Sequence, residues 1–133
     1  MQVTPYLFLN GNCEAALSFY RSALGAEIVF MQRMKDAPAQ DSECAVSPEA
    51  IMHASLKIGD SLLLASDGDG KATPYSGFSI SLSVKDTTEG RRVFDALAAG
   101  GSVTVPFEKT FWTEGFGMLT DRFGVPWMVN CEH

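Results

Sequence analysis

The chain has 133 residues, of which 46% are hydrophobic and 20% charged, and its formal net charge is −6. This size and composition suit one globular domain that buries its core without metal or disulfide cross-links. The acidic balance disfavours nucleic acid as a partner, because nucleic-acid phosphates would be repelled. No apolar run is long enough to span a bilayer and no signal peptide is recognisable. We therefore expect a cytoplasmic protein without a membrane partner.

The first half of the chain begins with the pattern strand, helix, strand. Residues 3–9 alternate between two faces and predict a strand. Asn12 is the expected N-cap of a helix with apolar residues at helical spacing, and Gly25 is its expected stop. Residues 26–33 predict the second strand.

A polar segment and a hairpin complete this half. Residues 35–48 predict a mobile loop. Residues 51–58 and 61–66 predict a hairpin, in which His53 and Ser55 share the face opposite the apolar residues. The acids in and beside the loop are expected to be solvated charges and not metal ligands; they are Asp36, Asp41, Glu43 and Glu49.

The same pattern then occurs again. Residues 67–70 predict a linker turn, because no glutamate follows at the closing position of a calcium-binding loop. Residues 78–84 predict a strand, and Asp86 with Glu89 predicts a capped helix that ends at Gly100.

The C-terminal stretch is predicted to be strands only. Residues 102–107 form the first of them, and residues 118–120 and 125–130 form a hairpin around the turn 121–124. This region is rich in aromatic residues, which either fill a core or line a ligand-binding cup. They are Trp112, Phe116, Phe123 and Trp127.

The two halves match at a constant offset. Phe94 follows Phe19 by 75 positions, and Gly100 follows Gly25 by the same interval. This predicts an internal duplication of a βαβββ module. Each module is too small for a good core by itself, so the predicted fold is α+β, with two paired modules forming a curved, cup-like mixed sheet. The predicted organisation is one domain, with modules at about 1–67 and 75–133 and a linker at 68–74.

Four segments resemble a known superfamily: PYLFLNGNCEAALSFYRSALGAE, MHASLKIGDSLLLASD, YSGFSISLSV and TFWTEGFGMLTDRFGVPWMVN. They are similar to the PhnB/YjdN-like branch of the vicinal oxygen chelate superfamily. That superfamily includes glyoxalase I, fosfomycin and bleomycin resistance proteins and extradiol dioxygenases. The resemblance implies a glyoxalase-like fold for most of the chain, but it brings no established reaction.

The resemblance also places metal ligands on the first and last strands of each module. The corresponding positions have no His, Asp or Glu, and hydroxyl and thioether groups are poor ligands for a hard or borderline divalent ion. We therefore expect no metal and no other cofactor, and a metal-dependent glyoxalase reaction is disfavoured. The positions are Thr4 or Pro5, Leu63 or Leu64, Ser79 and Met128.

His53 is the candidate catalytic residue. If the apolar face of its strand meets the helices, His53 points into the cup, where an imidazole can act as a general base or bind a ligand. The alternative is a partly buried histidine satisfied by a neighbour. The candidate ligand-binding residues are Tyr6, Phe8, Ser55, Ser79, Ser81, Trp112, Phe116 and Met128.

The three cysteines, Cys13, Cys44 and Cys131, are odd in number and lack zinc-site spacing, so they are expected to be reduced thiols. Cys13 opens a predicted helix, where its pKa can fall. The alternative is a small packed residue.

Three classes of function remain. The favoured one is a metal-free protein that binds a small anionic or aromatic molecule in the cup. The second is a metal-dependent glyoxalase-like isomerase or antibiotic-modifying enzyme. The third is a drug-sequestering protein of the bleomycin-resistance kind. The expected partners are the small molecule and a second copy of the chain, because each half-sheet needs a partner and a symmetric homodimer supplies one.

Overall fold

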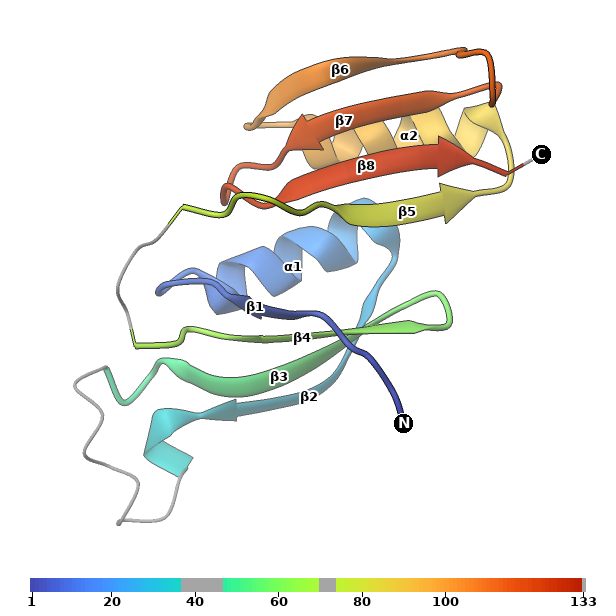
Figure 1. The fold of residues 1–133 in the computed structure, drawn as a ribbon. Helices are drawn as coiled ribbons and strands as arrows, with labels where there is room; N and C mark the ends of the chain where they lie inside the picture. Colours follow the sequence, from blue (N-terminus) through green and yellow to red (C-terminus); the bar gives the residue numbers. More distant parts are fainter. Residues whose placement is uncertain (37–46, 70–73, 133) are drawn as a thin grey trace. The chain divides into compact units, whose positions relative to one another are not determined.

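The computed structural model describes residues 1–36, 47–69 and 74–132. These residues form two α-helices, one short 3-10 helix and eight strands, which is an α+β fold (Figure 1). The chain divides into two compact units, Met1–Thr73 and Pro74–His133, which we name the first and the second unit. Neither described helix has the length and apolarity that a membrane span requires.

The first unit is a four-stranded sheet with one helix. Its strands lie in the order β1-β4-β3-β2, and β1 runs parallel to β4 while the other neighbours are antiparallel (Figure 1). The elements are β1 (Tyr6–Phe8), α1 (Cys13–Leu24), β2 (Glu27–Arg33), the 3-10 helix η1 (Met34–Asp36), β3 (Ile51–Ile58) and β4 (Ser61–Ser66).

The second unit repeats this topology with the order β5-β8-β7-β6. Its register repeats as well, because Ile28 pairs with Leu56 and Val103, 75 positions after Ile28, pairs with Leu119. The predicted duplication of a βαβββ module is therefore confirmed. The elements are β5 (Ile80–Val84), α2 (Thr87–Ala98), β6 (Ser102–Glu108), β7 (Phe116–Thr120) and β8 (Pro126–Cys131).

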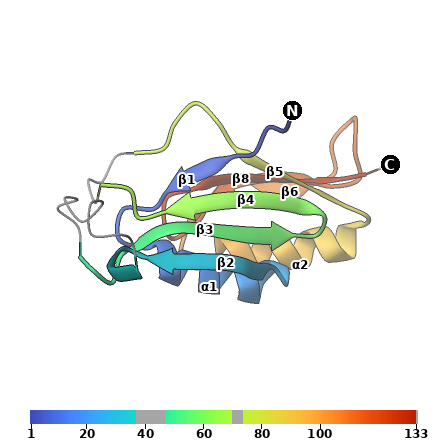
Figure 2. The ribbon, with the colours of Figure 1, turned by 90° about the horizontal axis from the view of Figure 1, so that it is seen from below.

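Each helix contacts one face of its own sheet (Figure 2). In the first unit Ala54 and Leu56 of β3 are fully buried on the side of α1, where Leu17 and Tyr20 are also buried. Side chains alternate along a strand, so His53 and Ser55 lie on the opposite face, as predicted. We call the sheet face that points away from the helix the open face of its unit.

In the second unit the helix approaches the sheet closely around Phe107. This ring is 3% exposed and lies 5.6 Å from the ring of Phe94. A side-chain carbon at Gly90 or Gly115 would come within 2.6 or 2.5 Å of the Phe107 ring, and one at Gly117 would come within 2.6 Å of the Phe94 ring. These glycines leave the space that the two rings occupy, so any larger residue there would force a shift.

Three strands differ by two residues or more from the bounds that the sequence predicted. β1 is shorter than residues 3–9, although backbone bonds from Leu64 N–H to the Pro5 carbonyl and from Leu9 N–H to the Ser66 carbonyl extend its pairing. β5 begins at Ile80, so Ser79 precedes the strand. β7 begins at Phe116, two residues before its predicted start. Glycine is a weak strand former, but Gly117 is needed in this strand for close packing.

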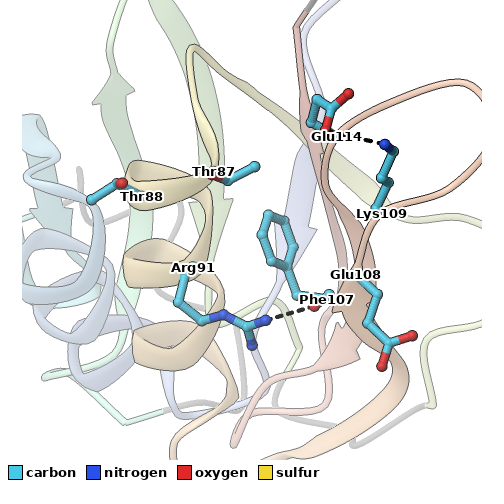
Figure 3. A pocket seen from close by; sticks show the side chains of 7 residues that line it. All are labelled: Thr87, Thr88, Arg91, Phe107, Glu108, Lys109 and Glu114. Carbon is cyan, nitrogen blue, oxygen red and sulfur yellow. Dashed lines mark hydrogen bonds and ion pairs between the residues drawn. The ribbon is translucent and has the colours of Figure 1, made fainter.

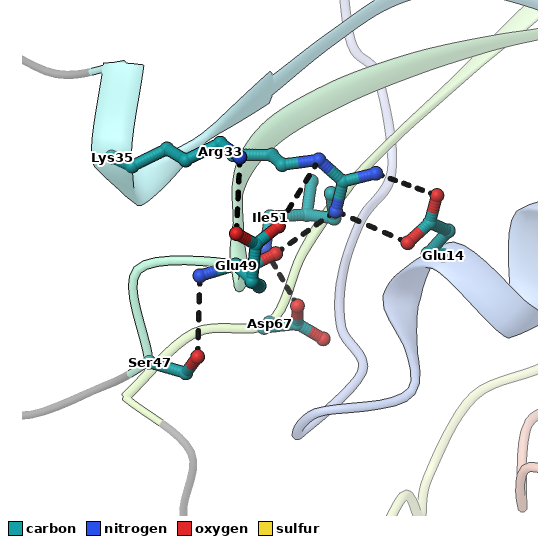
Figure 4. A network of polar contacts seen from close by, with 7 residues as sticks. All are labelled: Glu14, Arg33, Lys35, Ser47, Glu49, Ile51 and Asp67. Atoms are coloured by element: carbon teal, nitrogen blue, oxygen red, sulfur yellow. Dashed lines mark hydrogen bonds and ion pairs between the residues drawn. The ribbon is translucent and has the colours of Figure 1, made fainter.

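Asp67 is a structural carboxylate and not only part of a linker turn, which corrects the sequence interpretation. It is 4% exposed, and one of its oxygens accepts a hydrogen bond from Cys13 N–H at 2.8 Å. The other accepts one from Ile51 N–H at 2.7 Å (Figure 4). Asn12 occupies the N-cap position, but its side chain makes no capping bond. Asp67 therefore satisfies the first N–H of α1 from the end of β4 and also holds the start of β3.

Ion pairs surround this junction at the surface. Arg33 at the end of β2 donates to Glu14 of α1 at 2.7 Å, and Lys35 lies 3.0 Å from Glu49 (Figure 4). Glu49 is therefore paired rather than only solvated, although exposed pairs contribute little stability. Asp41 and Glu43, with most of the predicted loop 35–48, lie outside the described residues.

The predicted turn between β7 and β8 is confirmed, and Asp121 organises it. This carboxylate is 3% exposed and accepts hydrogen bonds from Phe123 N–H, Val125 N–H and the indole N–H of Trp127. Trp127 is fully buried and its only polar atom needs such an acceptor. Of the aromatic residues in this region, Trp127 therefore belongs to the core.

Replacing Asp67 by Asn should destabilise the first unit. The amide has one accepting oxygen where two backbone N–H groups need acceptors, and its NH₂ group would face a donor. We expect a loss of about 1–3 kcal/mol in the free energy of unfolding. Urea denaturation measures it, with Asp60→Asn in the exposed hairpin turn as the matched control. Equal midpoints for the two variants would contradict the role of Asp67.

Candidate functional site

The open face of the first unit gathers aromatic side chains. Residues paired across neighbouring strands point to the same face. Tyr6 pairs with Leu64, Leu64 with Ser55, and Ser55 with Phe30, so these four side chains form a row across the sheet. Tyr6 is 38% exposed and Phe30 48% exposed. This face therefore offers to solvent a ring from each edge strand of the sheet, β1 and β2.

His53 lies in the next row of the same face. Its Nδ1 is 3.2 Å from the hydroxyl oxygen of Tyr6. Its ring centroid is 5.6 Å from that of Tyr6 and 5.9 Å from that of Phe30. The ring centroids of Phe8 and Tyr6 are 5.0 Å apart. The structure thus brings together His53, Tyr6, Phe8 and Ser55, all of which are candidates from the sequence. Phe30 was missed, because its strand showed no polar residue of interest.

The hydrogen bond with Tyr6 determines whether the other imidazole nitrogen, Nε2, is a donor or an acceptor. Nε2 makes no hydrogen bond within the described part of the chain. If the Tyr6 hydroxyl donates to Nδ1, neutral His53 carries its proton on Nε2, which is then a donor. If Nδ1–H donates to the phenol oxygen, Nε2 is an acceptor and can take a proton. In both tautomers the free nitrogen is available to a bound molecule.

The open face of the second unit has a different composition. Ser81 pairs with Met128, which pairs with Met118. In the next row Asn130 lies between Ser83 and Phe116. The ring of Trp112 lies 5.3 Å from that of Phe116, in edge-to-face geometry. The candidates Ser81, Met128, Phe116 and Trp112 therefore share this region, while Ser79 is half-buried ahead of β5.

Equivalent positions in the two units carry different chemistry. In the first unit Ala54 pairs with Ala65, and in the second unit Gly117 pairs with Val129 in the same place. Ala54 therefore corresponds to Gly117. His53, one residue before Ala54, corresponds to Phe116. Asn130 did not stand out in the sequence. The signal was its polar side chain in an alternating apolar strand, but sequence does not show whether such a group has a partner.

The residues at the superfamily's metal positions do not fit a metal ion. Leu64 lies on the open face of the first unit and has no donor atom, and Leu63 is 2% exposed on the helix side. Met128 offers only a thioether. Among the described residues no group of three His, Cys, Asp or Glu side chains could hold a metal. The donor chemistry is therefore wrong for a divalent ion.

Cys13 is a packed residue and not a reactive thiol. It is fully buried. Burial first, and then the nearby charges of Asp67 and Glu14, raise the pKa of its thiol to about 12. The helix start was expected to be able to lower this pKa, but desolvation of the thiolate dominates. Burial also raises the pKa of Cys131.

A separate open pocket of about 620 Å³ lies beside α2 in the second unit (Figure 3). Its two cations already have partners. Arg91 donates to the Phe107 carbonyl at 2.6 Å and lies over the Phe107 ring, and Lys109 lies 3.8 Å from Glu114. Both cations that line this open pocket are therefore held by partners within the second unit.

The fold is that of the glyoxalase superfamily. A glyoxalase/bleomycin resistance protein/dioxygenase family enzyme from Burkholderia phytofirmans PsJN has a TM-score of 0.64 and 16% identity, covering 97% of this chain and 94% of that chain. At this identity the likeness shows the fold alone. The two βαβββ units and the likeness to this neighbour together show that the chain has the glyoxalase-like fold, as the sequence predicted.

More similar relatives define the family. Protein YjdN of Escherichia coli K12 is 42% identical over 140 residues, covering 98% of this chain and 95% of that protein. The crystal structure of PA1353 from Pseudomonas aeruginosa has 47% identity and a TM-score of 0.89, covering 99% and 98% of the two chains. A putative 3-demethylubiquinone-9 3-methyltransferase, PhnB protein, from Bacillus cereus has 23% identity and a TM-score of 0.81, covering 99% and 100% of the two chains, a likeness that shows the fold alone.

The family described as 3-demethylubiquinone-9 3-methyltransferase matches residues 1–130. The chain belongs to this family, which confirms the resemblance seen in the sequence.

The purified protein should contain no stoichiometric catalytic metal, because Leu64 and Met128 cannot replace carboxylate or imidazole ligands. Elemental analysis after purification without chelator tests this. One equivalent of zinc, nickel, manganese or iron per chain, removed by dialysis together with an activity, would contradict it.

Proposed function

We propose that this chain is a metal-independent member of the glyoxalase superfamily that binds a small aromatic or anionic molecule on the open faces of its sheets. His53 is the group proposed to contact the polar part of that molecule, and a reaction is not assigned. The observation that carries the proposal is the Tyr6–His53 hydrogen bond on an exposed aromatic sheet face.

Two properties of this face support binding over a purely structural role. Tyr6, Phe8 and Phe30 are 38%, 55% and 48% exposed, so they present rings rather than fill a core. A few polar groups among apolar walls are typical of small-molecule sites. The Tyr6 hydroxyl holds the imidazole through Nδ1, and Nε2 keeps a hydrogen-bonding function that the described part of the chain does not use. A planar ligand with an anionic or hydrogen-bonding substituent matches this combination.

The open face of the second unit is proposed to offer groups of its own for binding a small molecule. Trp112 is 45% exposed and packs edge-to-face on Phe116. Met128 is an adaptable apolar contact, and the hydroxyls of Ser81 and Ser79 provide polar ones. Binding without turnover would make the protein a sequestering protein, whereas turnover would give His53 the role of general base.

Replacing His53 by Asn tests the proposal. We expect a thermal midpoint close to that of the wild type and an affinity for 8-anilinonaphthalene-1-sulfonate reduced at least tenfold, or about 1.4 kcal/mol. Fluorescence titration measures the affinity for this flat aromatic anion. Tyr6→Phe should give a smaller loss, because the imidazole remains but loses its orienting hydroxyl.

His133→Asn, at the other histidine of the sequence, is the matched control and should bind as the wild type does. If His53→Asn instead melts much earlier and binds the probe normally, His53 is a packing residue and the site assignment is wrong.

A symmetric homodimer in the cytoplasm is part of the proposal. Each unit is an open four-stranded sheet with edge strands, and a second copy can supply the partner that each half-sheet needs. Buried free thiols at Cys13 and Cys131 suit a reducing compartment.

Sedimentation at micromolar concentration should give about 29 kDa, twice the 14.4 kDa of the chain. A species of one chain mass at all concentrations from low micromolar upward would refute the dimer.

A further inference from the structure

We propose that Asn130 is a ligand-binding residue whose Oδ1 accepts a hydrogen bond from the O–H or N–H group of an aromatic molecule. The inference deepens the proposed function, since it assigns a ligand chemistry to the open face of the second unit. It requires that this face binds a small molecule, but it does not require a role for His53.

The primary observation is an unsatisfied atom. Asn130 Oδ1 is buried and has no hydrogen-bond partner in the described part of the chain. A buried acceptor without a donor is unfavourable, because the folded chain has removed it from water without replacing the lost bond. Such a group is retained at a position where something outside the chain supplies the donor, such as a ligand.

Other buried polar side chains in this unit are satisfied. The Thr113 hydroxyl donates to the Cys131 carbonyl at 2.8 Å. The Asp121 carboxylate accepts from two backbone N–H groups and from Trp127. The unit therefore pairs its structural polar groups, and Asn130 departs from that pattern.

The strand direction excludes an internal partner on the core side. Val129 and Cys131, on either side of Asn130 in β8, are 0% and 1% exposed and lie on the face that α2 covers. Asn130 consequently lies on the open face, between Ser83 of β5 and Phe116 of β7.

The neighbours indicate the kind of ligand. Paired residues on one sheet face have Cβ atoms about 5 Å apart, so the Phe116 ring adjoins the Asn130 amide. Trp112 extends this apolar surface, with its ring 5.3 Å from that of Phe116. A flat ring that packs there can direct a phenolic O–H or a heterocyclic N–H to Oδ1. A ligand that offers only acceptors would leave the amide oxygen unpaired.

Phenol and anisole form a matched pair of probes for this chemistry, because methylation removes the donor and keeps the ring. Ligand-observed NMR titration of the wild-type protein should give at least fivefold tighter binding of phenol. Phenol should also shift the side-chain amide resonances of Asn130. This measurement needs no variant, so it does not depend on whether a substitution folds.

Asn130→Leu should abolish the preference for phenol, because both probes then meet an apolar side chain. Without ligand, its thermal midpoint should equal or exceed that of the wild type, since an unpaired buried amide has been removed. Asn12→Leu, at an exposed amide that makes no capping bond, is the control and should keep the preference.

Several results would overturn the inference: equal binding of the two probes, tighter binding of anisole, no binding of either, or a markedly lower midpoint for Asn130→Leu. The last result would mean that Oδ1 is bonded within the protein. A preference for phenol that survives in His53→Asn, together with normal binding of the sulfonate probe by that variant, would reject the His53 site and keep that of Asn130.

Discussion

The packing of one helix against one face of each four-stranded sheet is the constraint on which the rest of the structure depends. Side chains alternate along a strand, so every residue that meets the helix directs its neighbours to the open face. Ala54 and Leu56 are buried beside α1, and this places His53 and Ser55 on the other side. The candidate site therefore follows from where the core lies.

Buried carboxylates fix the ends of these elements. Asp67 links the start of α1 to the start of β3, and Asp121 closes the turn that leads into Trp127. In each case the carboxylate accepts N–H groups that would otherwise be unpaired. These acids hold the strands in register, and the register in turn sets which side chains meet across the open faces.

Duplication has produced two units with the same topology and different surfaces. The first unit has an imidazole bonded to a phenol among exposed rings, while the second has serines, methionines and an unpaired amide. The positions where the resemblance places metal ligands carry apolar or weakly polar side chains, such as Leu64 and Met128. The proposed binding therefore relies on hydrogen bonds and rings and not on Lewis-acid chemistry.

The sequence by itself determined the two βαβββ units, most strand positions and the faces of β3, because hydrophobic periodicity and the 75-residue offset are local signals. It also placed Tyr6, Phe8, Ser55 and His53 as candidates. Tertiary structure alone decided that Tyr6 bonds His53, that Asp67 replaces Asn12 as the cap of α1, and that Asn130 Oδ1 has no hydrogen-bond partner among the described residues. Those facts join residues distant in the chain, and hydrogen-bond satisfaction depends on all neighbours at once. The loss of reactivity at Cys13 has the same origin, since burial by other elements outweighs its place at a helix start.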